Sequence, residues 1–280
     1  YTTAGLTLTN VVATDNRAGD GSLDSANLHE SGGGVGGAIA VLESLSATVT
    51  ITDSTFTGNR AGDGADSTGQ WGSPGGSGGA AWIVAATVAV SGSDFTDNRA
   101  GNSGSTTDVN GRPGGEGGAL RLQSNDVAID DSTFVSNSAG DGSSALSNVG
   151  NGGGGGAVSL SINGVGTLAA TITASLFNFN SAGDAGGSAI STGIDYGQSG
   201  GGGGAIKTTG PLGLDIQSTS FAYNHAGNGT ETRDGGGTVY GGPGGDGGAI
   251  FNWGSTVTVT GCSFSYNYAG DGGVGTSGNG

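Results

Sequence analysis

The sequence predicts an all-β protein, a single-stranded parallel β-helix (a solenoid) of about seven coils. Three observations support this fold class. The phrase Asn-x-Ala-Gly occurs seven times, at spacings of 43, 39, 39, 43, 44 and 43 residues. A short alternation of apolar and polar residues precedes each copy, and Gly makes up 66 of the 280 residues. A fixed period with strand-type alternation is typical of a solenoid, because each coil buries its apolar face against its neighbours.

The composition argues against other fold classes and against some partners. This much Gly is incompatible with a helical bundle, and the Gly residues lack the every-third-residue period of collagen. One Cys cannot form an internal disulfide. With 23 acidic and 7 basic residues the net charge is −16, which disfavours nucleic acid as a partner. The longest apolar runs fall short of the 18 residues of a membrane-spanning helix.

Each repeat contains three predicted strands, in a constant order. The first follows Gly-Gly-Ala, as in AIAVLE, the second resembles TVTIT, and the third resembles STFTGN. In the second strand, the positions seven and five residues before the Phe position are aliphatic in every repeat. These two columns are Leu6, Val49, Val88, Val127, Ala170, Leu214 and Val257, and Leu8, Ile51, Val90, Ile129, Ile172, Ile216 and Val259. The residues between them are small or polar, so one strand face is predicted to be buried.

The third strand ends in a Phe and an Asn that are predicted to stack from coil to coil. The Phe residues are Phe56, Phe95, Phe134, Phe177, Phe221 and Phe264, and the first coil has Ala13 instead. Three residues later come Asn16, Asn59, Asn98, Asn137, Asn180, Asn224 and Asn267. Coils stack about 4.8 Å apart, so we expect a buried Phe ladder and Asn side chains that bond their own copies at a bend. Cys262 belongs to a column of Val, Ser and Thr and is interpreted as a small buried filler.

A loop of 14–19 residues separates each Asn-x-Ala-Gly from the next Gly-Gly-Ala. One interpretation is a fringe of irregular surface loops. The other, which the similar loop lengths favour, is a stacked glycine-rich layer at one corner of the coil. In it, extended, polyproline-like stretches hydrogen bond their neighbours.

The first loop residue is a candidate metal ligand. It is acidic in five repeats, at Asp20, Asp63, Asp141, Asp184 and Asp271, and Asn in the other two. Stacked carboxylates repel each other unless something compensates their charge. We favour an Asx-turn, in which the N–H of the following Gly compensates the charge. A bound Ca²⁺ is the alternative, and calcium is the one cofactor that the sequence suggests.

A catalytic site is not expected. On the first strand, the residues predicted to point outward are Ala40, Trp82, Arg121, Ser159, Lys207 and Phe251. They include no carboxylate pair of the kind that polysaccharide-cleaving enzymes use. The two histidines, His29 and His225, lie far apart in the sequence and have no evident acidic partner.

The residues on either side of the repeated Asn change character along the chain. In the first three repeats they are mostly charged, with Asp15 and Asp97 before the Asn and Arg17, Arg60 and Arg99 after it. In the last three they include the aromatic residues Phe179, Tyr223, Tyr266 and Tyr268. One interpretation is a set of unrelated surface residues. The other is a contact patch made by these four aromatic residues, for a sugar or for another subunit.

The pairing of GGA(I/L/V) with FxxN, once per repeat, resembles the repeats of the chlamydial polymorphic outer-membrane proteins. The resemblance spans nearly the whole chain, with six copies of Gly-Gly-Ala, five of them followed by Ile, Leu or Val, and six copies of Phe-x-x-Asn. It implies a right-handed parallel β-helix and a role in adhesion.

We therefore expect residues 1–280 to form one β-solenoid domain, as a whole subunit or as a segment of a longer assembly. The expected function is a non-enzymatic extracellular structural protein: a cell-surface or filament-forming scaffold with adhesin-like character. A polysaccharide-binding or polysaccharide-degrading β-helix is the alternative. Expected partners are copies of the chain, end to end or side by side, and glycans or host proteins at a cell surface.

Overall fold

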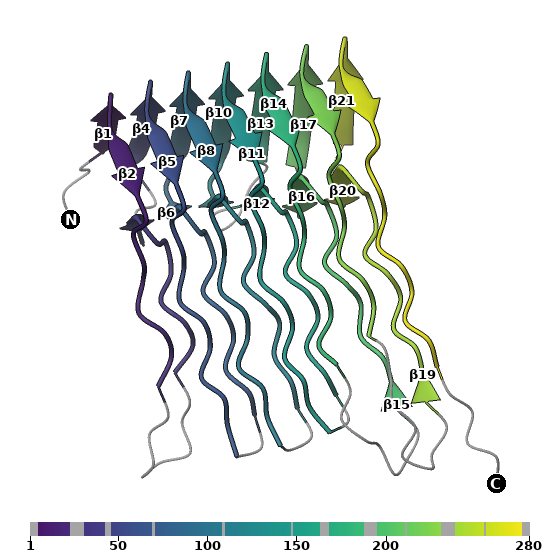
Figure 1. Ribbon diagram of the computed structural model, residues 1–280. Coiled ribbons are helices and arrows are strands. Elements are labelled where there is room, and N and C mark those ends of the chain that lie inside the picture. Colours follow the sequence, from purple (N-terminus) through teal and green to yellow (C-terminus); the bar gives the residue numbers. More distant parts are fainter. Residues whose placement is uncertain are drawn as a thin grey trace, which may run out of the picture.

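The computed structural model describes residues 5–22, 31–42, 46–68, 71–107, 110–146, 148–162, 168–187, 195–210, 212–230, 239–254 and 256–275. These residues form strands and no helix. Two seven-stranded sheets and one six-stranded sheet run along a common axis, and every strand pairs in parallel with its equivalents one repeat away (Figure 1). The predicted parallel β-solenoid of about seven coils is confirmed.

The three sheets collect the three strands of each repeat. Sheet I contains β1 (Leu6–Thr9), β4 (Thr48–Thr52), β7 (Thr87–Ser91), β10 (Asp126–Asp130), β13 (Leu168–Thr173), β17 (Leu212–Gln217) and β21 (Thr256–Thr260). Sheet II contains β2 (Val12–Thr14), β5 (Thr55–Thr57), β8 (Asp94–Thr96), β11 (Thr133–Val135), β14 (Leu176–Asn178), β18 (Ser220–Ala222) and β22 (Ser263–Ser265). Sheet III contains β3 (Ile39–Val41), β6 (Ala81–Val84), β9 (Leu120–Gln123), β12 (Val158–Ser161), β16 (Ile206–Thr209) and β20 (Ile250–Trp253). Two further short strands, β15 (Asp195–Tyr196) and β19 (Val239–Tyr240), pair in the loop layer.

The core contains the predicted Phe ladder. Neighbouring rings from Phe56 to Phe264 are stacked, with centroids 4.7–5.0 Å apart and interplanar angles of 1–9°. Phe56 to Phe221 are fully buried, whereas Phe264 in the last coil is 49% exposed. Each fully buried Phe contributes about 1.5–3 kcal/mol to stability. The coils therefore support each other through stacked copies of one side chain.

A ladder of buried Asn side chains holds the bend after sheet II. The backbone N–H and Nδ2 of Asn98 both donate to Oδ1 of Asn137, each at a distance of 3.0 Å. Nδ2 also donates to the carbonyl oxygen of Phe56, at 2.9 Å. The same contacts recur in the neighbouring coils, as predicted.

Cys262 belongs to a different column, in which the preceding coils have Val, Ser or Thr. Its Sγ lies 3.5 Å from the backbone nitrogen of Thr219.

The glycine-rich loops form an ordered layer in the described residues. Each loop has an outgoing leg, after Asn-x-Ala-Gly, and a returning leg, before Gly-Gly-Ala; Figure 1 shows the legs running side by side below the sheets. The backbone N–H of Gly115, on a returning leg, donates to the carbonyl oxygen of Gly101 on the outgoing leg of the same loop, at 2.9 Å. The carbonyl oxygen of Gly115 accepts the N–H of Gly140, on the outgoing leg of the next loop, also at 2.9 Å. Because this exchange repeats along the axis, the fringe interpretation is wrong for these residues.

Candidate functional site

The acidic column after Asn-x-Ala-Gly is compensated by the backbone of the next coil. Oδ1 of Asp141 accepts the backbone N–H of Asp184 at 2.9 Å, and Oδ1 of Asp63 accepts that of Asn102 at 2.8 Å. The same contact links the other members of the column, Asp20 to Asp63, Asn102 to Asp141, Asp184 to Asn228 and Asn228 to Asp271. The expected Asx-turn is thus corrected: the donor lies one coil away, not on the following Gly. Asp and Asn serve equally, since each contributes one Oδ1.

The charges of this column are unevenly compensated. The hydrogen bond from Arg17 lowers the pKa of Asp20, with an Nη2–Oδ2 distance of 2.7 Å. Burial raises the pKa of Asp141, and the hydrogen bond from the backbone N–H of Asp184, together with Arg99 at 3.8 Å, offsets this only in part. Among the described residues, no three His, Cys, Asp or Glu side chains lie close enough together to hold a metal ion. Calcium binding by Asp20, Asp63, Asp141, Asp184 and Asp271 stays a prediction.

Asp141→Asn is expected to stabilise the solenoid slightly at pH 7, by about 0.5 kcal/mol. Asn keeps the Oδ1 that accepts from Asp184, and it removes a charge whose pKa is raised on folding. A raised pKa means that the native state binds the proton more readily than the unfolded chain does. The advantage of Asn should therefore be greatest at neutral pH and disappear below about pH 3.9. Urea unfolding at several pH values measures it.

Asp141→Ala is the matched control, because it removes the charge and the acceptor together. It should destabilise the protein by about 1 kcal/mol at pH 7, since the N–H of Asp184 loses its partner. Equal effects of Asn and Ala would contradict a role for Oδ1.

The predicted aromatic residues form a continuous exposed strip beside the Asn ladder, which we call the aromatic strip: Phe179, Tyr223, Tyr266 and Tyr268. The rings of Phe179, Tyr223 and Tyr266 stack at centroid distances of 4.9 Å. They are 54%, 45% and 63% exposed. Tyr268 lies beside them, with its ring tilted against His225 at 6.4 Å. The structure brings the four residues together on one surface.

Three residues of the strip have a left-handed backbone conformation. Phe179, Tyr223 and Tyr266 have φ values of 55°, 55° and 52°. Their counterparts in the first four coils have the same conformation but are Asp15, Gly58, Asp97 and Ser136. Gly and Asp tolerate this conformation, whereas for a bulky side chain it is a strained outlier. The strip therefore places large aromatic residues where folding alone favours small ones.

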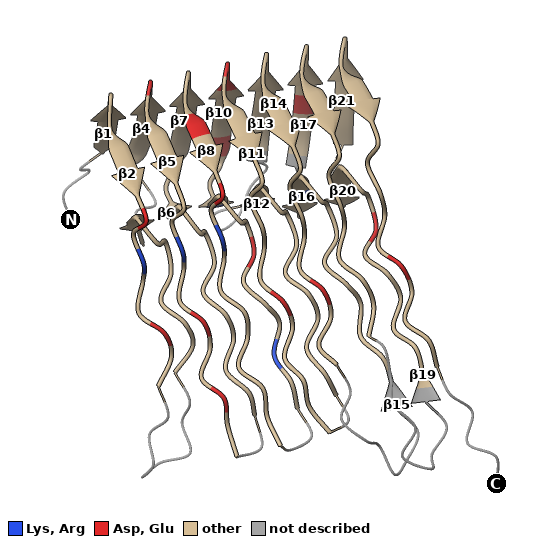
Figure 2. Ribbon diagram, viewed as in Figure 1, with Lys and Arg blue, Asp and Glu red and all other residues tan. Residues whose placement is uncertain are grey.

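The other half of the same face is charged, with Asp15 and Asp97 before the repeated Asn and arginines after it. Arg17, Arg60 and Arg99 pair as isolated parallel bridges in consecutive coils, directly after the Asn ladder. Figure 2 shows them as three neighbouring blue segments at the purple end of Figure 1. The column continues through two serines to His225 and Tyr268. One face of the solenoid thus has a charged half, in which Arg17 is paired with Asp20, and an aromatic half. The other histidine, His29, lies outside the described residues.

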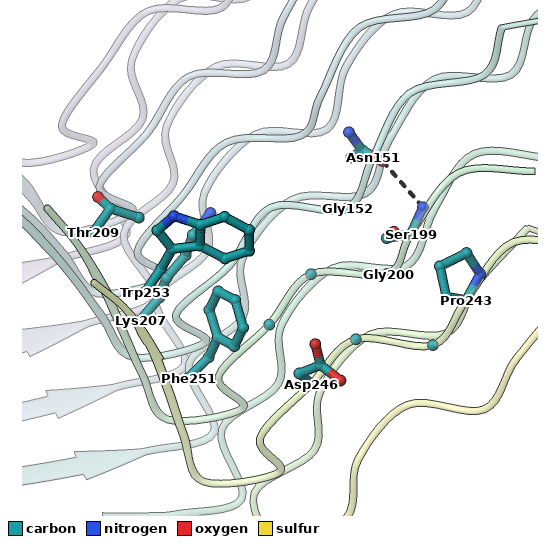
Figure 3. A pocket seen from close by; sticks show the side chains of 14 residues that line it. Asn151, Gly152, Ser199, Gly200, Lys207, Thr209, Pro243, Asp246, Phe251 and Trp253 are labelled. Atoms are coloured by element: carbon teal, nitrogen blue, oxygen red, sulfur yellow. Dashed lines mark hydrogen bonds between the residues drawn. The ribbon is translucent and has the colours of Figure 1, made fainter. Parts of the chain in front are cut away.

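A groove lies between the outer face of sheet III and the returning legs. It consists of two connected hollows of about 580 and 340 Å³, which share Asn151, Gly152 and Lys207. Figure 3 shows the larger one, with Phe251 from β20 near Asp246 on the returning leg and Trp253, also from β20, beside Lys207. Trp82 lines the smaller one. Of the sheet III residues expected to point outward, Trp82, Arg121, Lys207 and Phe251 line this groove. Ser159 is fully buried, and Ala40 is exposed outside the groove.

An ion cluster lies between the two ends of the groove. Glu116, on a returning leg, contacts Arg121 Nε at 3.2 Å and Lys207 Nζ at 2.5 Å. It also accepts the hydroxyl of Ser159 at 3.1 Å. Burial alone would raise the pKa of Glu116, but Arg121 and Lys207 outweigh burial and lower it. The carboxylate is therefore ionised and compensated at neutral pH.

Sequence reasoning missed Glu116 and Asp246 because it examined only the strand. Both acids occupy the position three residues before the Ala of Gly-Gly-Ala, on the leg that crosses the strand's outer face. The sequence does contain a signal for them, because this position is acidic in only two of the six repeats. Together with Arg121 and Lys207 in the outward column of the first strand, those two acids indicate a charged cluster.

The fold and these surfaces define a parallel β-solenoid with a hydrogen-bonded glycine-rich layer. No protein-family model matches the chain, and neither the curated proteins nor the solved structures contain a match to it. The chlamydial resemblance thus still depends on the repeated residues alone. The described residues include no helix that is long and apolar enough to cross a bilayer.

Proposed function

We propose that this chain is a non-enzymatic extracellular structural protein, a cell-surface or filament-forming scaffold with adhesin-like character. The observation that carries the proposal is the aromatic strip. Three exposed aromatic residues occupy left-handed positions, which cost about 1–3 kcal/mol each relative to glycine. Strain kept at an exposed surface is typical of a functional contact.

The partner that this face fits is a second copy of the chain, side by side and antiparallel. A two-fold axis through the fourth coil would place the first coil of one copy opposite the seventh coil of the other. Arg17 would then face Tyr268, and Gly58 would leave room for Tyr223. Arginine over an aromatic ring is favourable by about 0.5–2 kcal/mol, and a two-fold interface makes each such contact twice. The small residues Ser136 and Ser138 at the centre allow close approach.

The test is the double variant Tyr223→Ser/Tyr266→Ser, which introduces the residue that Ser136 supplies in the fourth coil. We expect the circular dichroism and the unfolding midpoint to be nearly unchanged, because Ser136 already holds the same left-handed conformation in the fourth coil. Self-association, measured by sedimentation velocity and electron microscopy, should be lost. Arg60→Ser should weaken association in the same way if the two halves of the face meet.

Tyr240→Ser is the control, since Tyr240 is also exposed but lies on β19 in the loop layer. It should leave association unchanged. A wild-type protein that stays monomeric at high concentration, or a double variant that associates as well as wild type, would refute the side-by-side contact.

A further inference from the structure

We propose that the groove over sheet III is a binding site for a neutral glycan chain that lies along the solenoid axis. It concerns a different face from the aromatic strip and does not depend on self-association.

Aromatic side chains are available at both ends of the groove. Trp253 is 69% exposed, and its ring is tilted by 48° to Phe251 at a centroid distance of 6.2 Å. The two rings therefore do not cover each other's faces. At the other end lies Trp82, whose Nε1 is buried and has no hydrogen-bond partner in the described structure. An aromatic face accepts the C–H face of a sugar ring.

The charges of the groove favour an uncharged ligand. Arg121 and Lys207 are both bound to Glu116, and Asp246 supplies a second negative charge at the Phe251 end. With two cations and two carboxylates, the groove has no net positive charge that would attract an anionic chain. The neutral polar side chains that line the larger hollow are Asn151, Ser199 and Thr209. Hydroxyl-rich, neutral ligands match this combination of neutral polar groups and rings.

The shape and rigidity of the groove favour an extended ligand. Trp82 and Trp253 are four coils apart, which corresponds to about 19 Å along the axis. The wall is held in place by hydrogen bonds between neighbouring legs, such as Gly201 to Gly183 at 2.8 Å and Gly245 to Gly227 at 2.7 Å. A preorganised wall lowers the ordering cost of binding. Several sugar units in a row can thus contact the site at once.

The experiment is isothermal titration calorimetry of the full chain with defined probes. These are the hexasaccharides of β-1,4-glucan, β-1,4-mannan and chitin, with hexagalacturonate and decaproline for comparison. We expect at least one neutral hexasaccharide to bind, more tightly than hexagalacturonate and decaproline. Trp253→Ala and Trp82→Ala should each weaken binding about tenfold.

Trp71→Ala is the matched control, because Trp71 is an exposed tryptophan that lies under Arg112 and outside the groove. It should bind like wild type. Tyr223→Ser/Tyr266→Ser should also bind like wild type, which separates this proposal from the previous one. The proposal fails if no neutral hexasaccharide binds, if galacturonate or decaproline binds better, or if Trp253→Ala, folded by circular dichroism, retains full affinity.

Discussion

Replacing Gly140 by Ala is expected to lower the free energy of unfolding by about 3 kcal/mol, the upper end for overpacking. A Cβ atom at Gly140 would lie 1.8 Å from the carbonyl oxygen of Gly101 on the neighbouring outgoing leg. The obstructing atom belongs to the backbone, so no side-chain rotation relieves the clash. Gly140 also donates to Gly115 and accepts from Gly153, so moving its leg would break both contacts.

Urea unfolding followed by circular dichroism measures this loss, and amide hydrogen exchange locates it. Because the backbone hydrogen bonds of each leg join it to the legs next to it, exchange should increase mainly in the legs around Gly140. Gly19→Ala is the control from the same column, since a Cβ there meets nothing within 4 Å. It should change stability by less than about 0.5 kcal/mol. Equal losses at Gly140 and Gly19 would show that close packing does not explain the glycine layer.

Asn137→Asp is the second change expected to have a large effect, a destabilisation of about 3–5 kcal/mol at pH 7. Asn137 is fully buried. Its Nδ2 donates to Oδ1 of Asn180 at 3.0 Å and to the carbonyl oxygen of Phe95 at 2.9 Å. An aspartate has no donor at this position, so a buried charge would face two acceptor oxygens. The similar shape of the two side chains confines the change to charge and hydrogen bonding.

The pH dependence identifies the cause. Burial beside acceptors raises the pKa of the new carboxyl group in the folded state above its unfolded value. The variant should therefore regain stability as pH falls through that raised pKa, while the wild type does not. Asn16→Asp, at the exposed end of the same ladder, should lose far less. A loss at Asn137 that is independent of pH would contradict this explanation.

The repeat period predicted which residues stack but not which legs meet. Phe134 and Asn137 were predictable because a ladder pairs each residue with its own equivalent, and the period alone identifies equivalents. The contact of Lys207 with Glu116 joins residues 91 positions apart. It depends on how a returning leg crosses the outer face of sheet III, and the period carries no information about that crossing.

Two other predictions, the acidic column and the aromatic strip, were only partly correct for the same reason. The acidic column was found, but its donors were assigned to the same loop because a turn is the local solution. In the folded chain the neighbouring coil offers an N–H in better position, as at Asp141 and Asp184. The aromatic strip was found from its residue types, whereas its left-handed backbone was not. Gly58 and Asp97 in that column were the sequence signal for the conformation.

The alternation of outgoing and returning legs has a mechanical consequence. The sheets form one flange of a beam and the glycine legs form a second flange, separated from the first by the depth of the coil. Bending such a beam must stretch hydrogen bonds on one side and compress backbone contacts on the other. The molecule is therefore expected to behave as a stiff rod with unequal flexural rigidity in its two transverse directions.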